Sequence, residues 1–472
     1  MNKNKILGYA LGPIGSALLG FISLPVITWF YSIEDVGKIS MLQVVASLTV
    51  LLFCLGLDQA YVREYHDSTD KPKLFKTSFL PGFILLILAF SGLYLVDEML
   101  ISRWLYEQES HYLTIVSFAC FILAFCSRFL SLILRMQERS FAYSMSQLLP
   151  KLFFLAFILS TVWLGLVKNF YNLITAHTLS MFIVFLVFSW NTRKQWVKSV
   201  TSTIDWNELK VLLHFGLPLV IGGLAAWGLN VMDKLFLRGL STFSELGVYS
   251  VTVSVAGIAT IFASIFNIIW APLVYKWVNE NKVDFKKIDD ISEYLLASIY
   301  FIVVLSGLFS WVLPYFLPHE YAAIQYLISA CLLGPLFYTL SEVTAVGIAI
   351  AKKTKYSMYV STIAMGVNAI GNYMLIPTLG AAGAAISTAI SFYFFYILRT
   401  EFSKKVWRKA SYHRSYIIVT LLLLVSITNA IFYQLVFFYF YWIGLFFFGI
   451  LFFREVLKKL HFNVLKLIKV RG

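Results

Sequence analysis

The chain has 472 residues, of which 60% are hydrophobic and only 13% are charged, with a mean hydropathy of +0.79. These values exclude an ordinary soluble domain, whose charged fraction is about 25%. The formal net charge of +14 does not indicate nucleic-acid binding, because the cations lie in short connections beside long apolar runs. Cations in such places set membrane topology and contact anionic lipid headgroups.

Fourteen long apolar runs follow one another along the chain. They lie near 10–30, 39–58, 78–96, 112–134, 145–167, 170–190, 211–232, 247–271, 294–316, 324–350, 357–376, 380–398, 416–433 and 436–453. About 20 apolar residues span the hydrocarbon core as a helix. The four cysteines fall within these runs without metal-ligand spacing, so we expect neither a metal site nor a disulfide set. The sequence therefore predicts an all-α integral membrane protein with about 14 transmembrane helices.

The Lys and Arg residues alternate between the two ends of these runs. If the N-terminus is cytoplasmic, 31 of the 38 fall in cytoplasmic connections or tails. External connections hold five, namely Lys38, Arg103, Lys168, Lys234 and Arg238. Arg128 and Lys151 lie inside runs. This bias predicts that both termini are cytoplasmic.

Short sequence echoes relate the two halves of the chain. Residues 34–40 (EDVGKIS) resemble 244–250 (SELGVYS) at an offset of 210, and 143–145 (YSM) recur at 356–358 with an offset of 213. Both pairs fall at equivalent places in successive blocks of six helices. An even number of helices makes the two blocks parallel in the membrane.

The echoes predict three parts. They are a six-helix bundle over 1–200, a second six-helix bundle over 201–410, and two added helices with a basic cytoplasmic tail over 411–472. Two matched bundles suggest a cavity that opens alternately to each side of the membrane, as in a transporter.

Three segments carry a resemblance to a known family. Residues 55–63 (LGLDQAYVR) resemble the end of the second helix of bacterial polysaccharide flippases, and 233–250 resemble their connection between helices 7 and 8. The most specific segment is 368–388, with Asn368, Asn372, a Pro and several Gly and Ala residues, which is similar to the hairpin of helices 11 and 12. The resemblance covers roughly residues 5–400. It identifies the fold better than the cargo, because drug and peptidoglycan-precursor exporters share the core.

The resemblance implies a function in the bacterial plasma (inner) membrane. Such a protein moves an undecaprenyl-pyrophosphate-linked oligosaccharide, of the O-antigen or capsule kind, from the cytoplasmic to the outer leaflet. The implied partners are this lipid-linked cargo, membrane lipids, and a polysaccharide polymerase with its chain-length machinery. The chain is then no enzyme and needs no cofactor.

A pyrophosphate headgroup needs fixed positive charge in a wet cavity. Arg128, inside the fourth run, is the first candidate, because a guanidinium offers phosphate a planar fork and a charge in the membrane usually points inward. The alternative is that it pairs with a buried acid, either Asp58 or Glu342. Lys151 attracts the headgroup or snorkels to the interface. Arg135 and Arg63 form a basic entrance or only set topology.

Few acids lie inside the apolar runs. Glu342, central in the tenth run, and Asp58, at the end of the second, are candidates for proton coupling or for structural ion pairs. The other polar residues within or beside the runs are candidates for gate or sugar contacts, and for each the alternative is an ordinary structural bond. They are Asp233, Lys234, Asn230, Asn368, Asn372 and His177.

Two other functions compete with the flippase. A drug or small-cation exporter on the same core would favour an interior of acids and aromatic residues, whereas Arg128 and Lys151 favour an anion. A membrane glycosyltransferase or polymerase would need a sizeable soluble domain or a long external loop, which the sequence does not show. The sequence also contains no phosphate-binding Gly-rich loop, so direct use of ATP is not expected.

Overall fold

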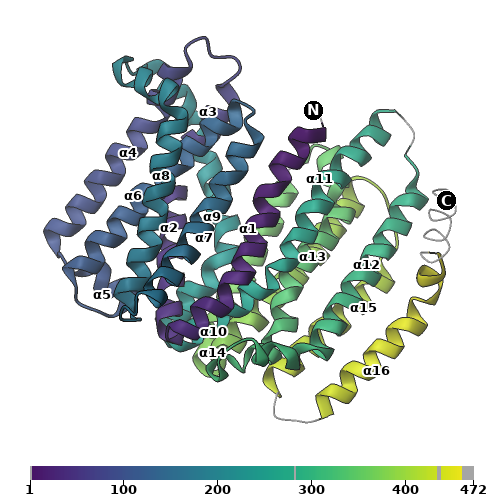
Figure 1. Ribbon diagram of the computed structural model, residues 1–472. Helices are drawn as coiled ribbons and strands as arrows, with labels where there is room; N and C mark the ends of the chain where they lie inside the picture. The colour runs from purple at the N-terminus through teal and green to yellow at the C-terminus, as the bar shows by residue number, and fades with distance from the viewer. Residues whose placement is uncertain (1–2, 281–282, 354, 433–436, 460–472) are drawn as a thin grey trace, which may run out of the picture. The chain divides into compact units, whose positions relative to one another are not determined.

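The computed structural model describes residues 3–280, 283–353, 355–432 and 437–459 (Figure 1). Within these ranges every regular element is an α-helix or a short 3-10 helix. The chain forms two compact units, unit 1 (Met1–Arg238) and unit 2 (Gly239–Gly472). The division falls near the end of α9, so the seventh predicted helix is grouped with unit 1.

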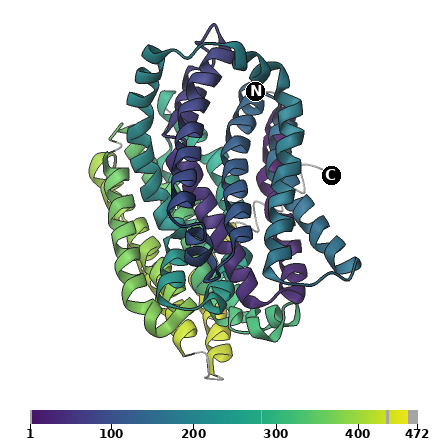
Figure 2. The same cartoon turned by 90° about the vertical axis from the view of Figure 1, so that its left-hand side faces the viewer.

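Unit 1 contains nine helices among its described residues. They are α1 (Lys3–Phe30), α2 (Ile33–Phe53), α3 (Leu57–Glu64), α4 (Lys71–Val96), α5 (Leu100–Tyr106), α6 (His111–Met136), α7 (Ser140–Trp163), α8 (Phe170–Thr201) and α9 (Trp206–Leu240). Figures 1 and 2 show the long helices of this unit running alongside one another. The α1 helix packs along α7, and α6 packs along α8.

Unit 2 repeats much of this order. Its described elements are α10 (Phe243–Ala256), α11 (Ile258–Asn279), α12 (Phe285–Leu308), η1 (Ser310–Tyr315), η2 (His319–Tyr321), α13 (Ile324–Ile350), α14 (Lys355–Val406), α15 (His413–Ile431) and α16 (Phe437–Phe452). The long α14 is two helices in one, because Gly380 has non-helical dihedral angles (φ 52°, ψ −126°).

Twelve helices of the described chain are long and apolar enough to cross a membrane. With α14 divided at Gly380 and the shorter α16 included, the described part of each predicted run falls on one helix or on two consecutive ones, as 39–58 does on α2 and α3. The fourteenth run begins at residue 436, which lies outside the described ranges. The part of the basic tail beyond residue 459 also lies outside them. The predicted fold class, an all-α multi-pass membrane protein, is confirmed.

Local structure recurs at the spacing of the sequence echoes or within one residue of it. Ser32 and Thr242 cap α2 and α10 by accepting backbone N–H bonds three residues on. Residues 36–40 and 246–250 are all buried. Glu138 and Lys352, 214 residues apart, both have a φ of 56° after α6 and α13. The echoes thus mark equivalent helix starts and ends.

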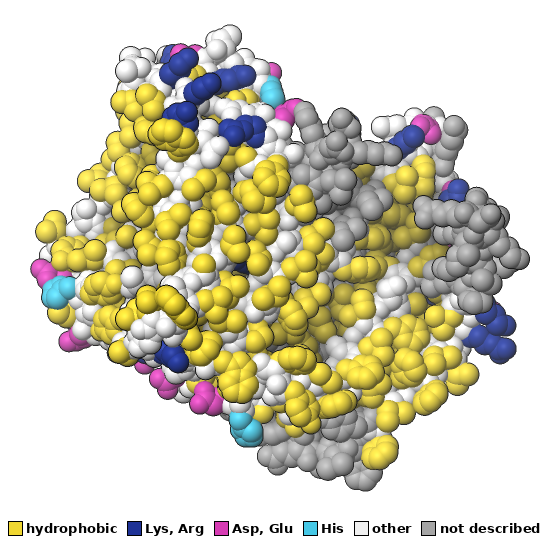
Figure 3. All heavy atoms as spheres, viewed as in Figure 1, with side chains coloured by type: hydrophobic (Ala, Val, Ile, Leu, Met, Phe, Trp, Pro, Cys, Tyr) yellow, Lys and Arg dark blue, Asp and Glu magenta, His cyan; other side chains and the backbone are white. Residues whose placement is uncertain are grey.

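In unit 1 the charges separate between the two ends of the helices. Figure 3 shows mainly Lys and Arg at the end that carries α3, with a few acidic side chains and a His beside them, and mainly Asp, Glu and His at the end that carries α5. The first group includes Arg63, Arg193 and Lys198, and the second includes Glu98 and Glu107. The band between them is covered by hydrophobic side chains, as expected for a surface in lipid.

Candidate functional site

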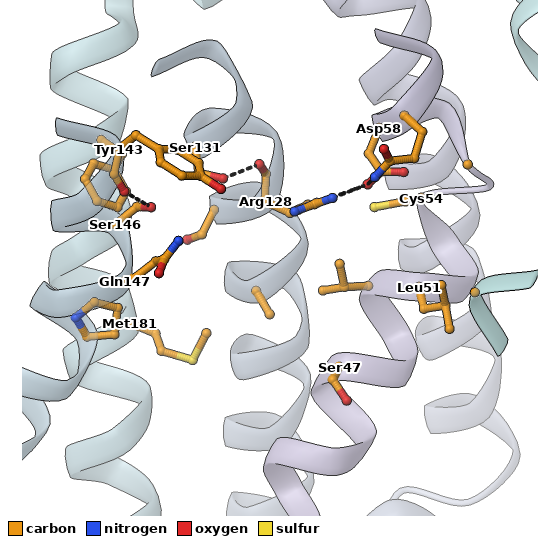
Figure 4. Close-up of a pocket in the computed structure, with 18 of the residues that line it drawn as sticks. Ser47, Leu51, Cys54, Asp58, Arg128, Ser131, Tyr143, Ser146, Gln147 and Met181 are labelled. Atoms are coloured by element: carbon orange, nitrogen blue, oxygen red, sulfur yellow. Dashed lines mark hydrogen bonds and ion pairs between the residues drawn. The ribbon is translucent and has the colours of Figure 1, made fainter. Parts of the chain in front are cut away.

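Unit 1 contains a cavity of about 760 Å³ between α2, α3, α6, α7, α8 and α9 (Figure 4). Three helices line it at the spacing i, i+3, i+4 and i+7, which is one face of a helix. These stripes are Ser47, Val50 and Leu51 on α2, with Cys54 directly after it; Ala124, Ser127, Arg128 and Ser131 on α6; and Tyr143, Ser146, Gln147 and Pro150 on α7.

The packing of α6 explains why Arg128 faces this cavity. The next side chain, Phe129, is fully buried and lies edge-on to Phe79 of α4, with ring centroids 5.4 Å apart. Phe125, one turn earlier, contacts the same ring at 5.5 Å. These aromatic side chains face α4. Arg128, one residue before Phe129, points about 100° away around the helix and therefore faces the cavity.

Arg128 forms an ion pair with Asp58. Both Nε (3.0 Å) and Nη2 (2.6 Å) donate to the same carboxylate oxygen, Oδ2. Gln59 donates to that oxygen as well, at 3.1 Å. The Asp58 side chain is 11% exposed and that of Arg128 is 32% exposed. Among the described residues, Arg128 Nη1 has no hydrogen-bond partner, so part of the guanidinium fork can still bind an anion.

A break between α2 and α3 places Asp58. The second apolar run does not form one helix, because Leu55 (φ 53°) and Gly56 (φ 72°) take left-handed conformations and α3 starts at Leu57. A Cβ on Gly56 would lie 2.1 Å from the carbonyl oxygen of Gly216 in α9, and a Cβ on Gly82 of α4 would lie 2.1 Å from that of Phe53. Glycines on two neighbouring helices therefore make room for the break.

The other predicted cations are not among the residues that line the cavity. Lys151 Nζ donates to the carbonyl oxygen of Ser16 in α1, at 2.8 Å. Arg63 is exposed, pairs with Glu64 at 3.3 Å and stacks on Phe215. Arg135 is exposed at the end of α6. Their predicted roles as an entrance for the cargo stay predictions.

Glu342 has its own partner within unit 2. Arg399 Nη1 donates to Glu342 Oε1 at 2.6 Å and to Ser341 Oγ at 2.9 Å. The guanidinium also lies over the rings of Tyr338 and Phe395. Both charged side chains are less than a fifth exposed. Arg399, the first residue after the apolar run 380–398, is part of the second half of α14.

Two predicted asparagines connect the halves of α14. Asn372 donates to Asn368 Oδ1 at 3.0 Å, and Asn368 Nδ2 donates to Thr388 Oγ1 at 3.3 Å. At the intervening break, Glu245 accepts the backbone N–H of Ala381 at 2.7 Å. Asn368 thus bonds across the break to the second half of α14, and the sugar contacts of both asparagines stay predictions.

The remaining predicted residues all lie in unit 1. Lys234 Nζ donates to Ser40 Oγ at 2.8 Å, and Asp233 is 2% exposed. Asn230 donates to the carbonyl oxygen of Ala226 in its own helix. His177 lies edge-on to a phenylalanine of α7, and its buried Nδ1 has no hydrogen-bond partner among the described residues. None of these four lines the cavity.

Residues 3–278, more than half of the chain, match the family described as Polysaccharide biosynthesis protein. The chain belongs to this family. No curated protein matches the sequence. The match covers all but the first two residues of unit 1 and nearly all of α10 and α11 in unit 2, and it confirms the resemblance found in the sequence.

Solved structures with the same fold cover nearly the whole chain. The lipid II flippase MurJ, in an inward closed conformation, superposes with a TM-score of 0.68 at 15% identity, over 97% of this chain and 99% of MurJ. An inward-facing multidrug resistance transporter of the MATE family gives 0.58 at 13% identity, over 84% and 96%. A mutant of the MATE transporter VcmN from Vibrio cholerae gives 0.53 at 10% identity, over 85% and 96%. At these identities the likeness shows the fold alone.

The sequence analysis missed the uncharged residues of this site. Ser127, Ser131, Tyr143 and Gln147 line the cavity but carry no charge to single them out. A signal was present, because polar residues recur at helical spacing along α6 and α7. Within the described residues, no group of His, Cys, Asp and Glu could hold a metal ion.

Proposed function

We propose that this protein is a flippase that moves an undecaprenyl-pyrophosphate-linked oligosaccharide from the cytoplasmic to the outer leaflet of the bacterial plasma membrane. The observation that carries the proposal is Arg128. It is a cation inside a helix long enough to span the membrane, it lines a cavity of about 760 Å³, and a third of its side chain is accessible. A phosphate-bearing headgroup is the kind of ligand that such a guanidinium binds.

The ion pair with Asp58 gives the site a way to release its cargo. A free guanidinium in the membrane would hold a pyrophosphate tightly, because little water competes for either charge. Here the carboxylate competes for the same donors, Nε and Nη2. The cargo enters at Nη1, displaces Asp58 in part, and leaves when the carboxylate returns. The cavity therefore binds an anion reversibly, as transport requires.

The comparisons support this cargo. The family is described as a polysaccharide biosynthesis protein, and the chain has the fold of a protein named as a lipid II flippase. The separation of charges in unit 1 supports the orientation, with the Lys- and Arg-rich end in the cytoplasm. In this proposal the protein is a transporter and catalyses no covalent step, and the polymerase that receives the cargo is a partner of the pathway. The two units of the flippase open the cavity alternately to each side of the membrane. Glu342 and Asp58 are the candidates for coupling this change to protons.

The test is to delete the gene in its native host and to measure where the lipid-linked oligosaccharide accumulates. We expect the cargo to accumulate facing the cytoplasm and the wild-type gene to restore export. Arg128→Ala should fail to restore it, and Arg128→Lys should restore part of it. Arg193→Ala, which removes an exposed cation from the end of α8, is the matched control.

Three results would contradict the proposal. Normal export from cells that lack the gene would exclude this cargo. Full activity of Arg128→Ala, at equal amounts of folded protein, would remove the cavity from the mechanism. Loss of resistance to cationic drugs without any change in glycan export would instead identify the protein as a drug exporter.

A further inference from the structure

The cavity of unit 1 has two chemically different sides. The charged side is formed by Asp58 and Arg128, which point toward each other in Figure 4. The neutral side, which we call the α7 wall, consists of Tyr143, Ser146 and Gln147. These three side chains come from one face of one helix, and Figure 4 shows them away from the ion pair. A ligand that fills the cavity therefore meets a cation on one side and uncharged hydrogen-bonding groups on the other.

Gln147 is the most informative member of the α7 wall. Its amide has two N–H donors and a carbonyl with two lone pairs, yet it makes no hydrogen bond to any described residue. A polar group with no partner at a membrane-embedded site is costly unless water or a ligand satisfies it. Gly12 of α1 leaves room for this amide, because a side chain at that position would place its Cβ only 3.2 Å from Gln147 Oε1.

The neighbours of Gln147 suit a carbohydrate. Tyr143 presents an aromatic ring with a polar end, which can pack on the C–H face of a pyranose. The Ser146 hydroxyl donates to the carbonyl oxygen of Tyr143 at 2.6 Å, so its lone pairs remain to accept from a ligand. An amide, a hydroxyl and an aromatic ring on one wall match the alternating polar and apolar surfaces of a sugar.

We propose that the α7 wall binds the uncharged sugar next to the pyrophosphate and selects the cargo by that sugar. The proposal rests on the proposed function, because it assumes a lipid pyrophosphate at Arg128. A cavity of about 760 Å³ lies within the range of about 300–1,000 Å³ that holds a compact ligand. The site thus accommodates the headgroup and the sugars nearest to it, and does not need to enclose a whole repeat unit.

The test compares two lipids on the purified full chain in nanodiscs. One is undecaprenyl pyrophosphate, and the other is the same lipid with a single N-acetylhexosamine. Binding is followed by the change in tryptophan fluorescence. We expect Gln147→Leu to weaken binding of the sugar-bearing lipid about tenfold, the effect of one lost hydrogen bond, and to leave binding of the sugar-free lipid unchanged. Gln147→Asn should recover part of the loss, and Gln43→Leu, at an exposed site in α2, should change neither.

The outcomes separate this inference from the proposed function. If Gln147→Leu weakens both lipids equally, or neither, the α7 wall is not a sugar site, although the flippase proposal stands. If Arg128→Ala leaves the binding of both lipids unchanged, the proposed function fails and the sugar site fails with it. If the leucine variant does not fold, Gln147→Ala provides the same comparison.

Discussion

The ion pair between Arg128 and Asp58 makes a prediction that can be measured apart from transport. Removing either charge leaves the other in a cavity that is only partly open to water. Two charges 4 Å apart interact by about 4 kcal/mol at an effective dielectric constant of 20, before the cost of desolvation is subtracted. Exposed pairs contribute about 0–1 kcal/mol, and breaking a fully buried pair costs about 3–5 kcal/mol. The exposed fractions of 11% and 32% place this pair between those limits, at about 2 kcal/mol.

A double-mutant cycle tests this estimate. Asp58→Asn and Arg128→Gln should each lower the free energy of unfolding by about 2 kcal/mol, measured by reversible unfolding in mixed detergent micelles. The double variant should lose about 2 kcal/mol less than the sum of the two single losses, because the second substitution removes a charge that has already lost its partner. Additivity within about 0.5 kcal/mol, the value for independent sites, would refute the argument that the pair is energetically coupled.

The same variant tests whether Asp58 competes with the cargo. With the carboxylate replaced by an amide, the guanidinium loses its anionic partner, so Asp58→Asn should bind undecaprenyl pyrophosphate more tightly and release it more slowly. Binding should improve about tenfold, and the transport rate in cells should fall. Weaker binding would show instead that Asp58 holds Arg128 in position and does not compete for it.

Further predictions concern the α2–α3 break, an interfacial ion pair and unit 2. Gly56→Ala should lower the free energy of unfolding by about 3 kcal/mol or more, because its φ is 72° and a Cβ would meet backbone at 2.1 Å, whereas Gly92→Ala, with no atom within 4 Å, should have little effect. The pKa of Asp205 is lowered from its ordinary value of 3.8 by the backbone N–H of Glu208 and by a lysine of α4. The ion pair of Asp205 with this lysine therefore stabilises the folded protein at pH values above 3.8, and its contribution is lost as the pH falls below about 4. Asp205→Asn should therefore make the free energy of unfolding depend less on pH on the acid side. Glu342→Gln should abolish the response of transport to an imposed pH gradient and leave cargo binding unchanged; a normal response would exclude a coupling role.

The helices could be predicted from the sequence because hydrocarbon leaves the backbone few alternatives. A long apolar run must form helix to pair its own N–H and C=O groups, and the described part of each run is helical, in one helix or in two consecutive ones. The break at Leu55 and Gly56 could not be predicted in this way. It depends on the close approach of glycines from α4 and α9, which is a tertiary contact that the composition of the run does not show.

The partners of the charged residues were equally hidden. From the sequence, either Asp58 or Glu342 could pair with Arg128. Only the three-dimensional arrangement shows that the partner is Asp58. Arg399 looked like a residue of a basic connection, because it follows the apolar run 380–398. The α14 helix continues to Val406, so the guanidinium stays beside α13 and pairs with Glu342.

The repeat makes these two ion pairs informative about each other. Arg128 on α6 and Glu342 on α13 are 214 residues apart, the same spacing that separates the left-handed residues after those helices. Equivalent helices therefore carry opposite charges at equivalent positions, and each charge is neutralised within its own unit. A structural ion pair works with its charges in either order, but a ligand that binds one member of the pair requires one sign, so different ligands in the two units would account for the reversal. An anionic headgroup suits the cation of unit 1, and a proton suits the carboxylate of unit 2, which is why the Arg128 and Glu342 variants should separate cargo binding from coupling.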